Sequence, residues 1–232
     1  MRDLSVPTSK SKLKLLDAAE EQIAKKGFDG VSVRDVTESA KANVAAVNYH
    51  FGSREGMMAT VIVRRMLPVQ QERLERLTAL EKRAGSKAIP TEELLEAFIR
   101  PLVTTAERWN LKPALAHPLA ARMLSLHAEA LPESMGEVMA EIWKRFPKCF
   151  AKSLPDVSPS ELLWRLHLVE GAVIQMLGAT DSLVRWSRGA ADEVSEEARL
   201  AGLLRFAAAG LREGQEIVAK KEKAGPQATF NF

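Results

Sequence analysis

Residues 43–55 of this chain read NVAAVNYHFGSRE. Asn43 is a favourable N-cap for a short helix, Gly52 places a tight corner after it, and Ser53 is a favourable N-cap for the next helix. Another short helix, residues 32–39, precedes this stretch and begins with a sequence that resembles a capping box. Two short helices joined by a turn of three or four residues form the helix-turn-helix unit, which presents a helix to the DNA major groove. DNA binding is therefore the first hypothesis.

The positive charge of the chain lies in the same N-terminal part. Residues 1–65 contain 11 Lys/Arg and 8 Asp/Glu, so they carry the whole formal excess of +3, and the remaining residues hold equal numbers of both. Lys10, Lys12 and Lys14 flank the motif, where contact with DNA phosphates would release condensed counterions. A solvated helix end explains three lysines equally well, so charge alone leaves both interpretations open.

The composition is that of an ordinary globular protein, with 46% hydrophobic and 27% charged residues among 232. No apolar run approaches the roughly 18–20 residues that a membrane span requires, and residues 1–7 lack the apolar core of a secretory signal. The single cysteine, Cys149, excludes an internal disulfide and is compatible with a reducing compartment. We therefore expect a cytoplasmic protein without a membrane segment.

Helical spacing runs through the whole chain. Apolar residues recur every three or four positions over residues 13–23, with Glu20 at the margin of the apolar stripe, and Gly27 ends that helix. The helix that begins at Ser53 is expected to kink or end at Pro68, because proline lacks the backbone N–H. Further helices are expected over residues 70–83, 91–108, 114–130, 133–152, 159–180 and 192–213.

These elements predict an all-α fold in two parts, since no pair of strand patterns flanks a hairpin turn. Residues 9–67 form a three-helix domain that contains the helix-turn-helix unit, and residues 68–214 form a larger helical domain. Its clearest helix start is SPSE at residues 158–161, which combines an N-cap, proline at the first helical position and glutamate at the third. Residues 215–232 are expected to be a disordered tail.

Four spaced segments resemble the N-terminal domain of tetracycline-repressor (TetR) family regulators: LLDAA at 15–19, KGF at 26–28, VSVR at 31–34 and NYHFGSRE at 48–55. The resemblance covers about residues 9–65. It implies a dimeric helical protein whose C-terminal domain binds a small effector and then releases the DNA. The segment AAVNYHF at 45–51 looks closest to a subgroup that includes regulators of fatty-acid metabolism.

The residues predicted to bind DNA lie in and around the two short helices. They are Ser32, Arg34, Asn43, Val44, Ala45, Asn48, Tyr49, His50, Ser53 and Arg54. Arginine reads guanine through two hydrogen bonds to O6 and N7, and the resemblance implies this kind of role for Arg34. The alternative for Arg34 is a surface ion pair with Glu38, one helical turn away. Small side chains at the start of the recognition helix can touch thymine methyl groups, although alanine is also simply a good helix former.

Asn48 departs from the family pattern, because most members have a tyrosine there whose hydroxyl contacts the DNA backbone. Tyr49 follows it, but a step of roughly 100° around the helix separates the two side chains. Either Asn48 bonds a phosphate or adenine, or the helix lies at another angle and Tyr49 packs within the small domain with its hydroxyl outward. His50 contacts a phosphate or a helix carbonyl. Ser53 and Arg54 begin the next helix, whose free N–H groups suit a phosphate.

The second part of the chain is expected to dimerise and to bind the effector. In the family, the last two helices pair with their copies into a four-helix bundle, here about residues 160–180 and 195–212. An internal helix pair is the alternative. A dimer would place two recognition helices about 34 Å apart, which matches successive major grooves of a palindromic operator.

The effector is expected to be a small hydrophobic or acyl-type molecule. The side chains that could line its pocket are apolar and partly methionine: Trp109, Met123, Leu124, Met135, Met139, Trp143, Phe146, Trp164 and Met176. The candidate partners for an acidic head group are Arg100, Arg122, His117, His127, His167 and Arg165. Each of these residues is also compatible with plain core or surface. The selected candidates are Arg100, Trp109, Arg122, His127, Trp143, Trp164 and His167. A buried arginine would be the strongest sign of a head-group partner. No metal site or cofactor is expected, since His117 and His127 are ten residues apart and no close histidine pair occurs.

Enzymatic function has little support in the sequence. It contains no glycine-rich phosphate loop, no nucleophile elbow and no metal-ligand spacing. Cys149 as a nucleophile would need a basic partner and a depressed pKa. A helical interaction module that has lost DNA binding is a third class, for which Asn48 is the only hint. The sequence favours a homodimeric transcription regulator, a repressor rather than an activator, and not an enzyme.

Overall fold

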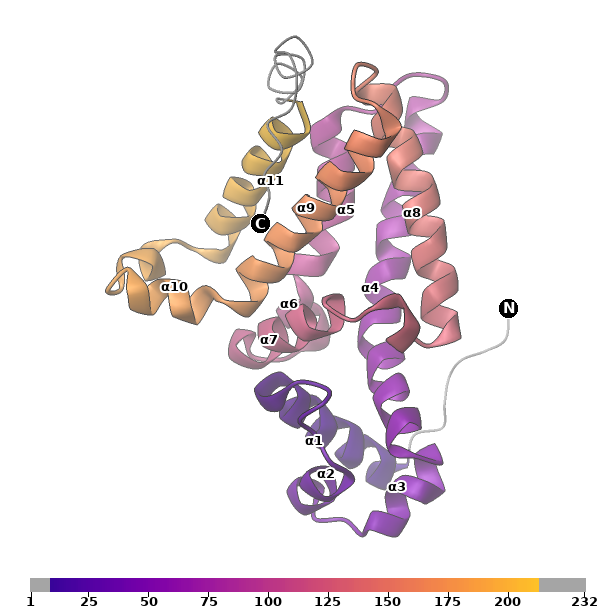
Figure 1. The fold of residues 1–232 in the computed structure, drawn as a ribbon, viewed down its shortest axis with the longest axis vertical. Coiled ribbons are helices and arrows are strands. Elements are labelled where there is room, and N and C mark those ends of the chain that lie inside the picture. The colour runs from indigo at the N-terminus through magenta and orange to yellow at the C-terminus, as the bar shows by residue number, and fades with distance from the viewer. Residues whose placement is uncertain (1–8, 213–232) are drawn as a thin grey trace, which may run out of the picture.

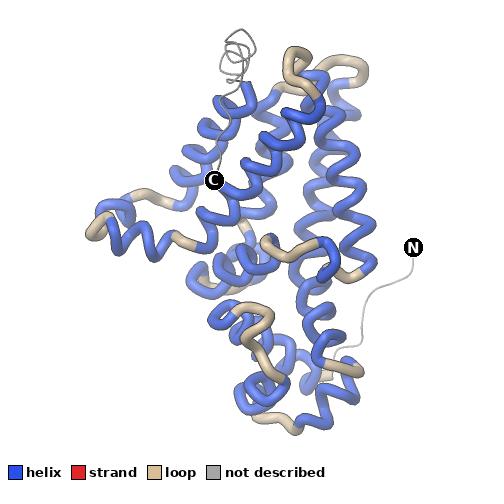
Figure 2. Tube along the Cα trace, viewed as in Figure 1, coloured by secondary structure: helices blue, strands red, loops and turns tan. Residues whose placement is uncertain are grey.

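The computed structural model describes residues 9–212, apart from the side chains of residues 192 and 193. Within this part, the chain consists of helices and loops without strands (Figure 1, Figure 2). The helices are α1 (Lys10–Lys26), α2 (Val33–Ala40), α3 (Val44–Phe51), α4 (Arg54–Ala84), α5 (Thr91–Val103), α6 (Thr105–Trp109), α7 (Pro113–Leu124), η1 (Ala128–Ala130), α8 (Glu133–Ser153), α9 (Pro159–Gly178), α10 (Thr180–Trp186), η2 (Ala190–Glu193) and α11 (Glu196–Arg212). The predicted all-α fold is confirmed. The predicted tail, residues 215–232, lies outside the described residues.

Helices α1, α2 and α3 pack together with the start of α4 at one end of the molecule (Figure 1). Their shared core contains Ile23 of α1, Val36 of α2 and Val47 of α3, all fully buried. Helices as short as α2 and α3 are not stable alone, so this packing and their end caps stabilise them. Gly52 ends α3 with a φ of 76°, which glycine adopts without strain. We call this unit the head and the remainder the body.

Helix α4 belongs to both head and body. It continues from the head into the body, where it packs against α5 and α8 (Figure 1). Pro68 does not end this helix, which runs on to Ala84. The buried neighbours Leu67 and Val69 anchor both sides of the proline, and their packing offsets the backbone hydrogen bond that proline cannot donate. The domain boundary expected after residue 67 therefore falls inside a continuous helix.

The body is a helical bundle: α5 and α8 pack against α4, α9 packs against α5, α7 and α8, and α11 packs against α5 and α9 (Figure 1). Its centre is aromatic: Phe98, Phe146 and Phe150 are buried, and the ring centroids of Phe98 and Phe146 lie 4.9 Å apart. Edge-to-face contacts of this kind add to the stabilisation from burial. No helix between residues 9 and 212 is long and apolar enough to cross a membrane.

Three expected helices begin or end at other residues, and a hydroxyl side chain lies at each of these boundaries. The range 91–108 is divided at Thr104, whose hydroxyl donates to the Arg100 carbonyl at 3.0 Å. The range 114–130 ends at Leu124, where the Ser125 hydroxyl donates to the Ala121 carbonyl at 2.8 Å. The range 192–213 begins instead at Glu196, because the Ser195 hydroxyl accepts from the Ala198 N–H at 3.3 Å. Such local bonds compete with a continuing helix.

The expected helix 159–180 ends at Gly178, and the short helix α10 that follows is absent from the sequence-based expectations. Helix α10 projects from the body between α9 and α11 (Figure 1). None of its residues is buried. A helix of seven residues is too short for its apolar side chains to show a clear helical period in the sequence.

Head and body meet where α1 packs against α7. Arg122 of α7 donates from Nε to the Ala24 carbonyl at 3.2 Å and from Nη2 to the Lys25 carbonyl at 3.4 Å. These bonds cap the C-terminal end of α1 with a cation, which is favourable there. Glu20, expected at the margin of a stripe, is instead buried, and its carboxylate accepts from Arg65 of α4 at 2.8 and 2.6 Å. The guanidinium makes this burial tolerable because it pairs with both oxygens.

Candidate DNA interface and effector cavity

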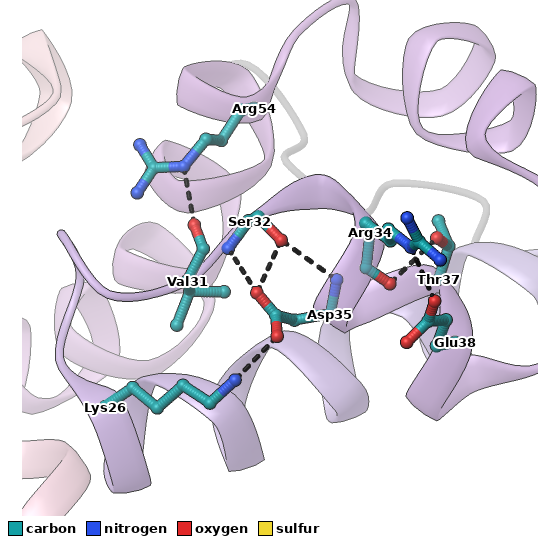
Figure 3. Close-up of polar contacts among 8 residues, drawn as sticks. All are labelled: Lys26, Val31, Ser32, Arg34, Asp35, Thr37, Glu38 and Arg54. Carbon is teal, nitrogen blue, oxygen red and sulfur yellow. Dashed lines mark hydrogen bonds and ion pairs between the residues drawn. The ribbon is translucent and has the colours of Figure 1, made fainter.

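The start of α2 is fixed by a capping box (Figure 3). The Ser32 hydroxyl accepts from the Asp35 N–H at 3.1 Å, and the Asp35 carboxylate accepts from the Ser32 N–H at 2.9 Å. Lys26 of α1 donates to the other oxygen of Asp35 at 2.6 Å. Hydrogen bonds from Lys26, and then from Ser32, hold the pKa of Asp35 far below its usual range. The predicted capping box is therefore confirmed, and Ser32 is rigidly placed.

Arg34 lies on the surface of α2, away from the Lys26–Asp35 pair (Figure 3). Its side chain is 85% exposed, and its Nε donates to Glu38 at 2.7 Å. The surface ion pair considered from the sequence is thus present. Exposed pairs of this kind contribute little to stability, so a DNA phosphate or base can replace Glu38 as a partner at small cost.

Helix α3 buries one side and exposes the other. Val47 is fully buried in the head, while the side chains of Val44 and Ala45 are exposed. The Asn43 side chain accepts from the Ala45 N–H at 2.9 Å and so caps the exposed first turn. A short, capped helix with an exposed outer side has the shape that the helix-turn-helix pattern predicts.

The end of α3 differs from one expectation. Tyr49 does not pack within the head: its side chain is 85% exposed, and its ring meets the His50 ring at a centroid distance of 4.9 Å. Asn48 is exposed as well, so both candidates for the backbone contact face solvent. His50 is half-buried, and its ring lies between those of Tyr49 and Phe51. The inner side of α3 is already filled by Val47, which leaves Tyr49 no place in the core.

Ser53 and Arg54 begin α4 in different roles. The Ser53 hydroxyl accepts from the Gly56 N–H at 3.0 Å, which makes it the N-cap. The Arg54 side chain points inward, and its Nε donates to the Val31 carbonyl at 2.8 Å (Figure 3). A second donor of Arg54 bonds the Phe28 carbonyl. Arg54 therefore joins α4 to the loop between α1 and α2.

Three of the expected effector-binding residues take part in separate structural contacts. Arg100 of α5 bonds Glu96 on its own helix and Glu197 of α11. Trp109 is buried, and its ring N–H donates to the Arg65 carbonyl at 3.1 Å. Trp143 of α8 packs on the aromatic core, with its ring centroid 6.4 Å from that of Phe98.

The other four lie at the surface. Arg122 and His127 line an open cleft between head and body. Trp164 is 65% exposed on α9, with the His167 ring beside it at a centroid distance of 5.9 Å. The structure therefore does not bring the seven residues into one pocket.

A different set of residues lines a small cavity between α4, α7, α8 and α9, with a free volume of about 50 Å³. None of the seven selected residues is among them, but four of the wider set of apolar candidates are: Met123, Leu124, Met135 and Met139. The lining residues are Ile62, Met66, Gln70, Leu102, Met123, Leu124, Leu126, Leu131, Met135, Met139, Glu170 and Ile174. Four methionines from α4, α7 and α8 make the cavity adaptable, because methionine side chains repack easily.

A fully buried arginine lies behind this cavity. Arg73 of α4 donates from Nη1 to Gln70 at 2.7 Å and from Nη2 to Glu170 of α9 at 3.3 Å. Its guanidinium carbon lies 4.1 Å from the ring centroid of Phe98, a cation–π contact. Burial lowers the pKa of Arg73, and the Glu170 carboxylate opposes that effect. The sequence could have indicated this burial, because helical spacing places Arg73 on the same side of α4 as Met66 and Leu77, which are both buried.

Comparisons with known proteins agree with this architecture. The family model described as bacterial regulatory proteins of the tetR family matches residues 15–61, and the model described as a tetracyclin repressor-like C-terminal domain matches residues 96–210. The chain belongs to the TetR family. Its helices α1 to α3 thus form the TetR-type head, and members of this family are transcription regulators rather than enzymes.

Individual relatives of this TetR-family chain are distant. The probable HTH-type transcriptional regulator YttP of Bacillus subtilis is 36% identical over 52 residues, which is 22% of this chain and about a quarter of that protein. A TetR-family regulator from Streptomyces coelicolor A3 matches with a TM-score of 0.55 and 17% identity over 92% of this chain and 98% of its own. A bacterial regulatory protein in the tetR family from Rhodococcus RHA1 matches with a TM-score of 0.54 and 18% sequence identity, and the match covers 90% of this chain and 100% of that one. A SmeT–triclosan complex matches with a TM-score of 0.50 and 17% sequence identity, and the match covers 87% of this chain and 91% of that one. The narrower resemblance to regulators of fatty-acid metabolism stays a prediction.

The TetR-type body also exposes large apolar side chains on its last two long helices. Leu163, Trp164 and Leu168 are exposed along one side of α9, and Phe206 is exposed on the neighbouring α11. Gly171 continues the exposed side of α9 with a small residue. Large apolar side chains that are exposed on neighbouring helices are typical of interaction surfaces.

Proposed function

We propose that this TetR-family protein is a ligand-responsive repressor that binds a palindromic operator as a homodimer in the cytoplasm. The observation that carries the proposal is the exposed outer side of α3. Its first turn presents Val44 and Ala45 to solvent, where small apolar side chains permit close approach to bases and contact with thymine methyl groups. The Asn43 cap holds this turn in place.

Polar groups around α3 would position the head on the DNA backbone. At the start of α2, the exposed guanidinium of Arg34 is within reach of a base edge or phosphate once it leaves Glu38. At the end of α3, exposed Asn48 and Tyr49 suit phosphate contacts, with His50 beside them. We assign Ser32, Asn43 and Ser53 to backbone contacts near their helix starts. Arg54 would act indirectly, since its donors already bond head carbonyls.

A second copy of the chain is the proposed partner of α9 and α11. Pairing with a copy would bury the large apolar side chains that these helices expose, which supports an interface there. A two-fold axis there would place the two α3 helices about 34 Å apart and require a palindromic site. Phe206→Glu is expected to yield monomers, as measured by sedimentation; a dimer that persisted would move the interface elsewhere.

The cavity between α4, α7, α8 and α9 is the proposed effector site. Its apolar, methionine-rich lining suits a small hydrophobic or acyl-type molecule. One neighbour of similar fold is a complex with triclosan, a small molecule, which supports a site of this kind in the body. The effector would release DNA only if it binds the non-DNA conformation more tightly. Helix α4 links the cavity wall to the head, so it is the element through which that preference would act.

Selection from a random pool of DNA duplexes tests the proposal. We expect recovery of a palindromic sequence, with affinity that falls steeply as salt concentration rises. Val44→Glu is the matched variant, because the residue is exposed and its replacement places a carboxylate against the DNA without disturbing the core. Recovery of no preferred sequence at moderate salt would instead support a helical interaction module.

A further inference from the structure

The effector cavity has one polar corner in an otherwise apolar wall. Of the residues that line it, Gln70 and Glu170 alone are polar, and they face each other from α4 and α9 through their shared partner Arg73. In an apolar pocket, a few placed polar groups decide which head group is accepted. The chemistry of these two side chains therefore indicates the class of ligand.

The orientation of the Gln70 amide follows from its partner. A guanidinium has only donors, so the Gln70 side chain must turn its oxygen toward Arg73, at 2.7 Å. Its NH₂ group is then directed away from Arg73. Across residues 9–212, we find no hydrogen-bond acceptor for this nitrogen. Gln70 is thus a fixed donor without a partner at the cavity wall.

Glu170 supplies an acceptor at the same corner. One carboxylate oxygen accepts from Arg73 at 3.3 Å, a long contact for a charge-assisted bond. The second oxygen has no hydrogen-bond partner in the described part of the chain. The cavity wall therefore presents one amide donor and one carboxylate acceptor.

The charges at this corner disfavour ionic head groups. Arg73 and Glu170 balance each other, so the corner carries no net charge to attract an ion. A ligand carboxylate would face the Glu170 carboxylate in a poorly hydrated site, where like charges repel strongly. A ligand ammonium would lose its hydration shell next to the buried guanidinium of Arg73. An uncharged group that both donates and accepts avoids these costs and satisfies both open positions.

We infer that the effector is a neutral amphipathic molecule whose head group is an amide or a hydroxyl, held between Gln70 and Glu170, and not an acid or an amine. Its carbonyl or hydroxyl oxygen accepts from the Gln70 NH₂, and its N–H or O–H donates to Glu170. The apolar tail lies among the methionines of the wall. This inference rests on the proposed effector-binding function and narrows the hydrophobic or acyl class to uncharged members.

Four six-carbon probes test this choice of head group: hexanamide, hexan-1-ol, hexanoate and hexylamine. Their tails match, so differences in affinity report the head group. Because the free volume of the cavity is about 50 Å³, the methionine side chains that line it must move to admit a six-carbon chain. Calorimetric titration of the full chain without DNA at neutral pH is expected to give hexanamide at least about a tenfold advantage over hexanoate and hexylamine. Equal or tighter binding of either ion would overturn the inference, and so would the absence of binding by all four probes.

Glu170→Gln is expected to invert the ranking. It removes the repelling carboxylate and leaves the Arg73 charge without a counterion, so hexanoate should then bind more tightly than hexanamide. Glu75→Gln, an exposed change on the same helix as Arg73, is the matched control and should leave the ranking unchanged. A Glu170→Gln protein that folds and still prefers hexanamide would contradict the inference.

Gln70→Leu provides a second variant in case Glu170→Gln does not fold. It keeps the Arg73–Glu170 pair and a similar side-chain volume but removes the donor, so hexanamide should lose about tenfold in affinity. Unchanged hexanamide affinity would overturn the inference. Because these titrations contain no DNA, a chain that selected no operator would refute the proposed regulator and still yield the ranking of head groups.

Discussion

The helix caps at the candidate DNA surface join residues that are close in sequence, whereas the buried ion pair at the cavity joins two helices that are distant in sequence. In the head, the Ser32 side chain caps α2 by accepting from the N–H of Asp35, three residues later. The Asn43 side chain caps α3 by accepting from the N–H of Ala45, two residues later. In the body, Arg73 reaches Glu170 on another helix, 97 residues away. The starts of α2 and α3 are therefore fixed by local caps, while the polar corner of the cavity depends on packing between distant helices. Changes in the two regions should differ in their effects on stability.

The largest effect is expected at Arg73. Arg73→Ala removes the partner of Glu170 and a fully buried side chain that packs on Phe98. Breaking a buried pair and leaving a cavity should lower the free energy of unfolding by about 3 kcal/mol, as measured by denaturant titration.

Arg76→Ala is the control for that change. Arg76 is on the same helix, but its ion pair with Glu72 lies nearer the surface, so the loss should be about 1 kcal/mol or less. Equal losses for the two variants would mean that the buried arginine contributes no more than a surface one, and the contrast between head and body would lose its main support.

The distance between partners also explains what could be predicted from the sequence. Caps and corners depend on residue types two to four positions apart, so Ser32, Asn43, Gly52 and Ser53 could be placed correctly as helix ends. The family resemblance rested on the same short segments. In contrast, the direction of the Arg54 side chain depends on carbonyls more than twenty residues away, and no local pattern contains that information.

The body was predicted only in outline for the same reason. Its helices follow from apolar periodicity, but which faces surround a cavity depends on how distant helices pack. The seven expected effector residues were chosen by residue type, and the structure distributes them over several sites. Arg73 was overlooked although its register with Met66 and Leu77 placed it on the buried side of α4. The position of this charged residue within an apolar stripe was thus the one sequence signal that could have located the polar corner of the cavity.

In the head, the largest functional effect is expected at Arg34. Arg34→Ala should weaken binding to the selected operator by about 1–3 kcal/mol, measured by fluorescence anisotropy, because a base or phosphate contact is lost. Glu38→Ala is the informative companion, since it removes the ion-pair partner and leaves Arg34 free. We expect it to bind as tightly as the unaltered protein or more so. If Arg34→Ala leaves the affinity unchanged, Arg34 is only half of a surface ion pair.

A smaller effect on stability is expected at the cap of α2. Ser32→Ala removes the hydroxyl that accepts from the Asp35 N–H, which should lower the free energy of unfolding by about 1 kcal/mol. Ser39→Ala is the matched control, because Ser39 is exposed on the same helix and its hydroxyl has no partner in the described part of the chain. A loss as large as that of Arg73→Ala would show that the head depends on one local contact as strongly as the body depends on its buried pair.

The smallest effect concerns pH and the same capping box. Asp35 has its pKa lowered by Lys26 and Ser32, so the folded protein binds a proton there less readily than the unfolded chain does. Its contribution to stability is therefore complete above the pKa of an unfolded aspartate, about 3.9, and is lost as pH falls below that value. Asp35→Asn should flatten the dependence of the unfolding free energy on pH in this acidic range.

Asp181→Asn is the control for the pH experiment, because Asp181 is exposed and has no ion pair among the described residues. It should keep the slope of the unaltered protein as pH falls below about 4. If the slopes of both variants matched that of the unaltered protein, the Lys26–Asp35 contact would not persist in solution. The start of α2 would then depend on the Ser32 hydroxyl and on the packing of Val36 against the head, and the support beneath Arg34 would be less rigid than its hydrogen bonds indicate.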